Sequence, residues 1–257
     1  MTQLLEARGL SKNFGGVVAL ESLDLTVMSN EILGLIGPNG SGKTTFFNVA
    51  TGIYGADNGT LTFDGANITG ASPRAVYYAG ISRTFQRSRL SLPLSVFDNV
   101  MIGNHKALNQ GLWFNLIKRK EFKREFEASY RMARMLLAVF EPRLAERMME
   151  PVAGLPMIDR RRIEICRALI SRPKLLLLDE PSAGMTHDET TELMNNILKV
   201  RDLNRDLTIV IVEHEMGVIE RITDRCVVLN FGRKIAEGPY RQVAADRQVQ
   251  EAYLGAA

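Results

Sequence analysis

The chain of 257 residues is long enough for one or two domains with a sizeable buried core. Hydrophobic residues make up 46% and charged residues 24%, a globular balance that excludes a collagen, a disulfide scaffold and a disordered tail. The net charge of +3 is too small to indicate nucleic-acid binding by itself.

Short apolar runs alternate with helical patterns along the chain. The first 30 residues and residues 60–63 are rich in Thr and Val, which favours a small antiparallel sheet. Apolar runs bounded by turn residues predict buried strands at 32–36, 81–85, 175–178, 208–212 and 226–229. Helices are predicted at 44–51, 188–203 and 216–223. Strands that alternate with helices predict an α/β fold with a mostly parallel sheet.

The segment from 87 to 170 breaks this alternation. It contains no convincing strand, and a long charged helical pattern covers 119–140, so we expect an inserted helical subdomain there. We assign residues 1–86 and 171–240 to a nucleotide-binding core that includes the antiparallel part. Residues 241–257 are interpreted as a C-terminal tail of the same single domain.

A glycine-rich phosphate loop follows the first buried strand. The segment GPNGSGKT fits the pattern G-x-x-x-x-G-K-[ST] in its expected place between a strand and a helix. Backbone N–H groups of such a loop surround phosphates, Lys43 supplies a charge for the β- and γ-phosphates, and Thr44 would give its hydroxyl to Mg2+. We therefore expect ATP and Mg2+ here, on the residues Gly37, Pro38, Asn39, Gly40, Ser41, Gly42, Lys43, Thr44 and Thr45.

Two carboxylates stand at the end of another buried strand. In KLLLLDE, four leucines predict a strand that ends at Asp179 and Glu180. Both acids then lie at the carboxyl edge of a parallel sheet, where ligands bind in such folds. We expect Asp179 to hold magnesium, and Glu180 to orient and deprotonate the attacking water. Taken alone, the segment also fits a strand followed by a solvated acidic turn.

Further segments stand in the order typical of ATP-binding-cassette (ABC) ATPases, and the chain resembles that family over nearly its whole length. They are SKNFGG with Phe14, SRTFQRS with Gln86, RRRIEICRALISRPKLLLLDEPSAG at 160–184, and IVIVEHE with His214. The resemblance implies a P-loop NTPase core. It also implies that Phe14 stacks on adenine, that Gln86 reaches the metal and the attacking water, and that His214 contacts the γ-phosphate. Read singly, the three residues also fit a core phenylalanine, a solvated turn and an incidental histidine.

Within this family the chain is most similar to the ATP-binding subunits of branched-chain amino acid importers. The likeness lies in NVMIGNHKALNQGLWF near 99–114, EPSAGMTHDETTEL at 180–193, the stretch 213–238 and VQEAYLG at 249–255. It implies an ATP hydrolase that works with transmembrane permease subunits and, indirectly, a solute-binding protein. The solute stays open, because relatives of this subgroup serve amino acids, urea, amides and small aromatic acids.

The sequence favours a cytoplasmic protein that is peripheral on the inner face of the cell membrane through its partners. No run approaches the roughly 18 apolar residues of a spanning helix, and the charged first residues do not fit a signal peptide. Cys166 and Cys226 are interpreted as free thiols of a reducing compartment.

Two surface patterns have more than one interpretation. The aromatic and aliphatic residues at 113–117, followed by the basic residues 118–120, fit a foot near anionic lipid or a permease contact. We favour a second interpretation, in which the aromatic residues fill the core of the helical subdomain and the basic residues are solvated. The basic run 160–162 lacks interleaved aromatic residues and is interpreted as a helix face, so no nucleic-acid partner is expected.

The family's signature motif is altered in this chain. Where relatives have LSGGQ or LSYGQ, residues 155–159 read LPMID. In the family's ATP sandwich, the signature serine and glycine of one subunit grip the γ-phosphate held by the other. Pro156 has neither a hydroxyl nor an N–H, Ile158 is branched where glycine is needed, and Asp159 is negative. The same residues suit a helix start, with proline at the first helical position and an acid in the first turn.

We therefore expect a heterodimer in which a second ABC ATPase supplies a complete signature to the nucleotide of this chain. Thr186, where many relatives have an Asp that links the two sites, points the same way. Two alternatives stay open: an ATP-binding regulatory subunit with little turnover, and a cassette ATPase outside transport. The second lacks support, because 86–155 has no sustained heptads and the chain has a single phosphate loop.

Overall fold

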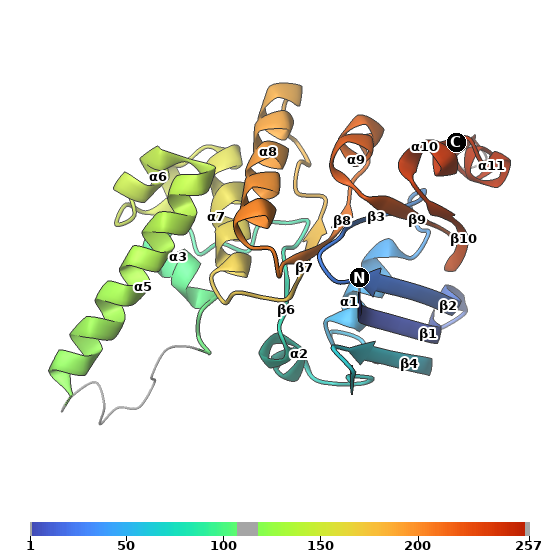
Figure 1. The fold of residues 1–257 in the computed structure, drawn as a ribbon, viewed down its shortest axis with the longest axis horizontal. Helices are drawn as coiled ribbons and strands as arrows, with labels where there is room; N and C mark the ends of the chain where they lie inside the picture. The colour runs from blue at the N-terminus through green and yellow to red at the C-terminus, as the bar shows by residue number, and fades with distance from the viewer. Residues whose placement is uncertain (1, 107–117, 255–257) are drawn as a thin grey trace. The chain divides into compact units, whose positions relative to one another are not determined.

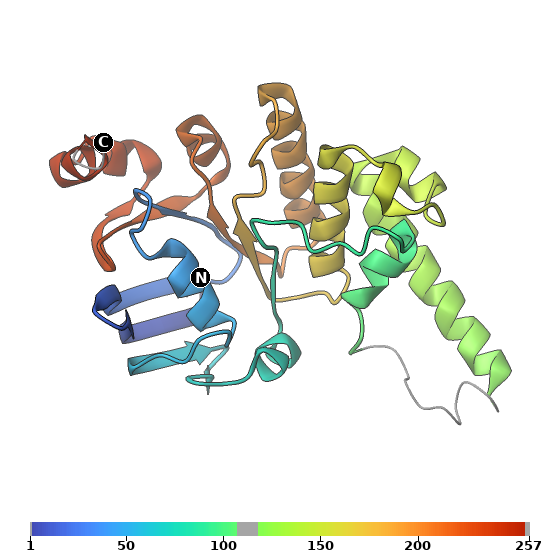
Figure 2. The same cartoon turned by 180° about the vertical axis from the view of Figure 1, so that it is seen from behind.

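The structure is a computed structural model that describes residues 2–106 and 118–254. The described residues form two compact units (Figures 1 and 2). Unit 1 is drawn from Met1–Arg83, Lys174–Pro181 and Arg201–Ala257, and unit 2 from Thr84–Pro173 and Ser182–Val200. Unit 2 overlaps the expected helical subdomain and also takes in residues 182–200.

The larger sheet of unit 1 has six strands in the order β10-β9-β3-β8-β7-β6. They are β3 (Ile32–Ile36), β6 (Ile81–Arg83), β7 (Leu175–Asp179), β8 (Thr208–Val212), β9 (Arg225–Asn230) and β10 (Arg233–Gly238). Every pairing is parallel except that of β10 with β9. All residues of β3, β7 and β8 are buried, as in a sheet covered on both faces. The predicted α/β fold with a mostly parallel sheet is confirmed.

Apart from one-residue extensions of β7 and β9, two details of this sheet differ from the prediction. The strand expected at 81–85 is wrong at its carboxyl end, because β6 stops at Arg83. The backbone carbonyls of Phe85 and Gln86 accept hydrogen bonds from Arg161 instead of joining the sheet. The antiparallel strand β10 was not predicted, since RKIAEG carries charges that mask the alternation.

A second, antiparallel sheet has the strand order β2-β1-β4-β5 and confirms the small sheet expected near the N-terminus. Its strands are β1 (Gln3–Phe14), β2 (Val17–Met28), β4 (Asn58–Phe63) and β5 (Ala66–Asn67). Burial along β1 and β2 alternates for much of their length, so one face of this sheet joins the core.

Helix α1 (Lys43–Ala50) lies between the two sheets (Figure 1). Phe46 and Phe47 are fully buried in one hydrophobic cluster with side chains from both sheets, such as Leu5, Leu35 and Val210. Aromatic side chains of this size bring a large share of the burial energy. The end of β3, where the phosphate loop begins, is therefore fixed by packing from both sides.

The other helices complete the two units. Those of unit 1 are α2 (Pro73–Ala79), α9 (Met216–Ile222), α10 (Tyr240–Ala244) and α11 (Arg247–Leu254), of which only α9 was predicted. Unit 2 holds α3 (Val96–Ile102), α5 (Arg119–Phe140), α6 (Pro142–Glu146), α7 (Met157–Leu169) and most of α8 (His187–Leu203). The helical pattern at 119–140 is confirmed at both ends, and the described part of 84–173 contains no strand.

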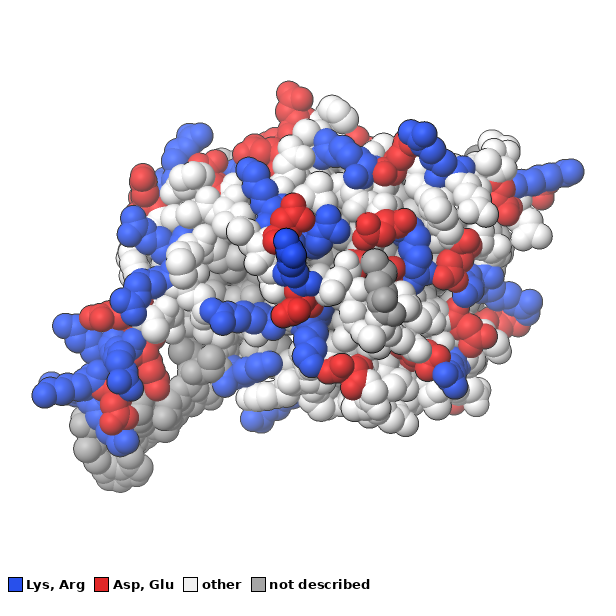
Figure 3. All heavy atoms as spheres, viewed as in Figure 1, with Lys and Arg blue, Asp and Glu red and all other residues white. Residues whose placement is uncertain are grey.

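Among the described helices, none combines the length and the apolar character that crossing a bilayer requires. On the face that Figure 3 shows, Lys and Arg side chains are interspersed with Asp and Glu. The cluster expected at 113–117 lies outside the described residues.

Candidate nucleotide-binding site

The phosphate loop runs from the buried strand β3 into α1, as the motif predicts. At two of its glycines a side chain would collide with the backbone. A Cβ on Gly37 would lie 2.1 Å from the Leu229 carbonyl oxygen, and a Cβ on Gly42 would lie 2.6 Å from the Ala19 carbonyl oxygen. Their φ values of 147° and 108° also favour glycine. Gly42 is the N-cap of α1, which no side chain caps, so the helix start suits a phosphate.

Lys43 lies inside this loop. Its ammonium donates hydrogen bonds to the carbonyl oxygens of Gly37 at 2.7 Å and Pro38 at 2.9 Å. Burial lowers the pKa of Lys43, while the nearby charges of Glu180 and Asp179 act to raise it. The loop, its lysine and both acids therefore share one electrostatic environment within unit 1.

Asp179 and Glu180 lie at the carboxyl end of β7, where the sequence predicts them. Asp179 is buried and its Oδ2 accepts a hydrogen bond of 2.6 Å from Arg83. Glu180 has φ of 47°, a left-handed conformation that is uncommon outside glycine and that clusters at functional sites. Its backbone N–H donates to Val212 at 2.9 Å.

His214 meets Glu180 at this edge. Because β7 and β8 pair in parallel with Asp179 opposite Val212, the residues that follow each strand lie side by side. The His214 Nε2 is 2.8 Å from Glu180 Oε1. The sequence places the two residues 34 positions apart, and the fold brings them into contact.

Phe14 is at the end of β1 and is 42% exposed, so it does not belong to the core. Its ring meets that of Tyr54 edge-on with centroids 5.1 Å apart, and Lys12 Nζ lies 5.5 Å from its centroid. An exposed ring steadied by two neighbours fits a platform for a flat ligand.

Gln86 belongs to unit 2 and is exposed, and one face of α7 holds its backbone. Arg161 donates to the carbonyls of Phe85 at 3.0 Å and Gln86 at 3.1 Å. Glu164 accepts from the Arg89 N–H at 2.8 Å and pairs with Arg161 at 2.9 Å. Sequence reasoning missed this clamp, although the three-residue spacing of its two charges on α7 is a usable signal.

The altered signature forms the start of α7. The helix begins at Met157 with Pro156 as its N-cap, so the prediction that the proline occupies the first helical position is wrong by one residue. Its ring still fits, because the N-cap needs no intrahelical N–H bond. Asp159 stands in the first turn and accepts a 2.8 Å hydrogen bond from Arg162.

Thr186 caps the start of α8. Its backbone N–H donates to Glu189 Oε2 at 2.9 Å, while its hydroxyl accepts from the Glu189 N–H at 3.3 Å. This reciprocal pair is a capping box at the start of α8.

The residues present fit a magnesium ion that arrives with phosphates. Within the described residues, no group of three or more His, Cys, Asp or Glu side chains could hold a metal alone. Magnesium is usually bound by one or two protein oxygens together with substrate phosphates. The Thr44 hydroxyl in the first turn of α1 and the Asp179 carboxylate are oxygen ligands of this kind.

Known proteins resemble this chain over nearly its whole length. The family model described as ABC transporter matches residues 20–183, and the one described as Branched-chain amino acid ATP-binding cassette transporter matches residues 233–257. The chain is similar to the high-affinity branched-chain amino acid transport ATP-binding protein LivG of Escherichia coli (strain K12), 37% identical over 99% of this chain and 98% of that protein. The corresponding BraF protein of Pseudomonas aeruginosa is 36% identical over the same shares. A crystal structure titled as the ADP conformation of an ATP-binding cassette of an ABC transporter matches with a TM-score of 0.84 and 30% identity, over 99% of this chain and 100% of that one.

Proposed function

Since this chain belongs to the ABC transporter family of ATPases, we propose that it drives a membrane importer of branched-chain amino acids or a related small solute. It is an ATP hydrolase whose activity is coupled to transport. The proposal of an importer draws on the full-length likeness to LivG and BraF. It places the chain at the inner face of the cell membrane, against permease subunits that receive solute from a solute-binding protein.

One arrangement carries the proposal: the phosphate loop, Lys43, the two acids of β7 and His214 meet in unit 1. In the proposed reaction the loop amides and Lys43 hold the phosphates. Asp179 and Thr44 would hold magnesium, which would offset the charge that develops on the phosphates. Glu180 orients and deprotonates the attacking water, and its contact with His214 keeps its carboxylate in place beside the γ-phosphate.

Two variants test this assignment. Glu180→Gln keeps the shape of the side chain and removes the base, so we expect hydrolysis to fall by about 10² or more with ATP affinity retained. Lys43→Ala should instead weaken ATP binding itself. Binding by a fluorescent ATP analogue and phosphate release separate the two effects. Unchanged turnover in both variants would exclude the proposed site.

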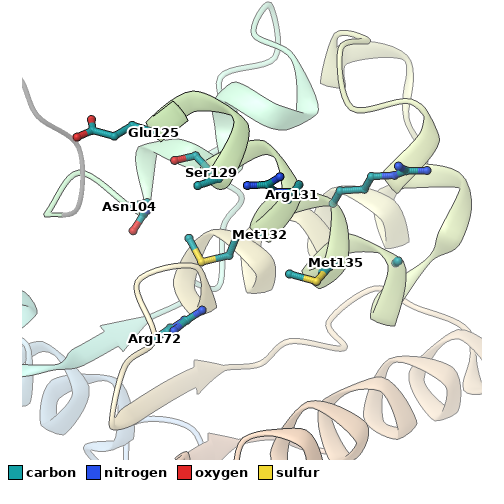
Figure 4. A pocket seen from close by; sticks show the side chains of 10 residues that line it. Asn104, Glu125, Ser129, Arg131, Met132, Met135 and Arg172 are labelled. Carbon is teal, nitrogen blue, oxygen red and sulfur yellow. The ribbon is translucent and has the colours of Figure 1, made fainter. Parts of the chain in front are cut away.

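A groove in unit 2 supports the proposed contact with a permease. It has a volume of about 700 Å³ and lies along α5, with Asn104 and Arg172 on its other sides (Figure 4). Met132 and Met135 give it an apolar, adaptable floor, and Met135 is 65% exposed. Three arginines line it against one acid, Glu125, so we infer that it receives a cytoplasmic helix with apolar and acidic side chains; the arginines are Arg131, Arg134 and Arg172. Met135→Glu should weaken co-purification with the permease without changing ATP binding.

The altered signature supports a heterodimer. Asp159 brings a negative charge to the start of α7, and Pro156 supplies no N–H there. We therefore propose that a second cassette ATPase with a complete signature closes over the nucleotide of this chain, and that the other composite site is impaired. Loss of one comparable donor costs about 10²–10³ in rate. A purified homodimer with the full rate of the assembled transporter would contradict this.

The assembled complex also distinguishes an ATP hydrolase from a regulatory subunit that only binds ATP. If this chain only binds ATP, Glu180→Gln in the assembled complex leaves hydrolysis unchanged. If it turns over ATP, the same substitution removes most of the activity. A role outside transport predicts no change in solute uptake when the chain is deleted.

A further inference from the structure

Arg83, the last residue of β6, is buried against the expected magnesium ligand. Its guanidinium donates to Asp179 Oδ2 at 2.6 Å and to Asn48 Oδ1 at 2.6 Å, and it lies 5.3 Å from the centre of the Phe47 ring. The Arg83 and Asp179 side chains are only 5% and 2% exposed. Contacts from β7 and from α1 thus fix the position of the arginine, and the arginine fixes the Asp179 carboxylate.

The ionisable side chains of the proposed site contact groups of the chain itself. Arg83 pairs with Asp179, Glu180 lies against His214, and the Lys43 ammonium is turned onto two carbonyls of its own loop. Arg83 and Asp179 are both buried, and loss of either one would leave the other as an uncompensated buried charge. The Arg83 guanidinium is therefore held beside the Asp179 carboxylate. A cation that approaches Asp179 alone therefore meets a fixed positive charge.

We propose that Arg83 is a positioning residue of the magnesium site, which orients Asp179 and offsets its charge so that a divalent cation binds only together with nucleotide phosphates. The phosphates bring several negative charges and outweigh the single charge of the arginine. Without them, Arg83 offsets the charge of Asp179, so the pair offers a divalent ion little net attraction. The inference rests on the proposed function, because it takes Asp179 as the metal ligand.

Binding of Mn2+ to the nucleotide-free full chain, measured by electron paramagnetic resonance, tests this role. Arg83→Gln keeps a hydrogen-bond donor and removes the charge, so it should tighten Mn2+ binding by about tenfold or more. Arg83→Lys keeps the charge and should stay within about threefold of the wild type. Asn48→Asp adds a carboxylate beside Arg83 without emptying the buried pair, and it should also tighten Mn2+ binding. This variant keeps the test intact if Arg83→Gln does not fold.

The double variant Arg83→Gln/Asp179→Asn checks where the ion binds. It should no longer show the tighter Mn2+ binding of Arg83→Gln. The proposal is overturned if Arg83→Gln or Asn48→Asp binds Mn2+ no more tightly than the wild type, or if the gain survives loss of Asp179. ATP binding by the wild type is measured in parallel. A wild type that binds no ATP refutes the proposed function, whereas normal ATP binding with unchanged Mn2+ affinities refutes only the role of Arg83.

Discussion

The buried pair of Arg161 and Glu164 should be one of the most costly places to change in unit 2. The two side chains are 7% and 2% exposed and lie 2.9 Å apart. Arg161→Met removes this ion pair together with the hydrogen bonds to the Phe85 and Gln86 carbonyls. It leaves the buried Glu164 carboxylate with the Arg89 N–H at 2.8 Å and the more distant Arg167 guanidinium at 3.9 Å, so we expect a cost of about 3 kcal/mol, the lower end of the range for a broken buried pair.

A double variant separates charge from packing. Arg161→Met with Glu164→Leu also removes the carboxylate that has lost its closest charge partner, so we expect it to recover at least about 1 kcal/mol of the loss. Urea unfolding followed by far-UV circular dichroism measures both free energies. Both variants should lower the ATPase rate of the assembled transporter, because neither holds the backbone of Gln86. A loss below about 1 kcal/mol for the single variant, or equal losses for both, would refute the reasoning.

Three further results are expected. Gly37→Ala should lower the free energy of unfolding by about 2–4 kcal/mol, because its Cβ would collide with a backbone carbonyl. Gly40→Ala, which has open space around it, should lower it by about 1 kcal/mol. Thermal unfolding compares the two variants, and equal losses would argue against the collision. Burial raises the pKa of the Cys166 and Cys226 thiols, so neither should react with a thiol reagent near neutral pH until the chain unfolds; rapid labelling of the native protein would contradict this. Burial raises the pKa of Tyr253 to about 12 from its ordinary value of about 10, so the unfolded chain ionises first and stability falls as pH rises between these values. Tyr253→Phe should flatten that fall, and an identical alkaline profile in both proteins would oppose it.

Several features of the site could be predicted from the sequence because they depend on neighbours in the chain. The strands at 32–36 and 208–212 are confirmed residue for residue, since continuous apolar runs of this length have few other structures. The phosphate loop follows from the backbone freedom that its glycines supply. Where charges interrupt a pattern, as in β10, the same reasoning failed.

The sequence by itself therefore determined the class of fold, the glycine-rich loop between β3 and α1, and the strand that leads into Asp179 and Glu180. Only the tertiary structure decided what surrounds those acids: Arg83 reaches Asp179 across 96 residues, and Arg161 reaches the Phe85 carbonyl across 76. Nothing in the sequence next to either arginine distinguishes it from an ordinary polar residue. Burial makes them specific, because a charge removed from water must find a partner of opposite charge or a hydrogen-bond acceptor, and sheet topology decides which partner lies within reach.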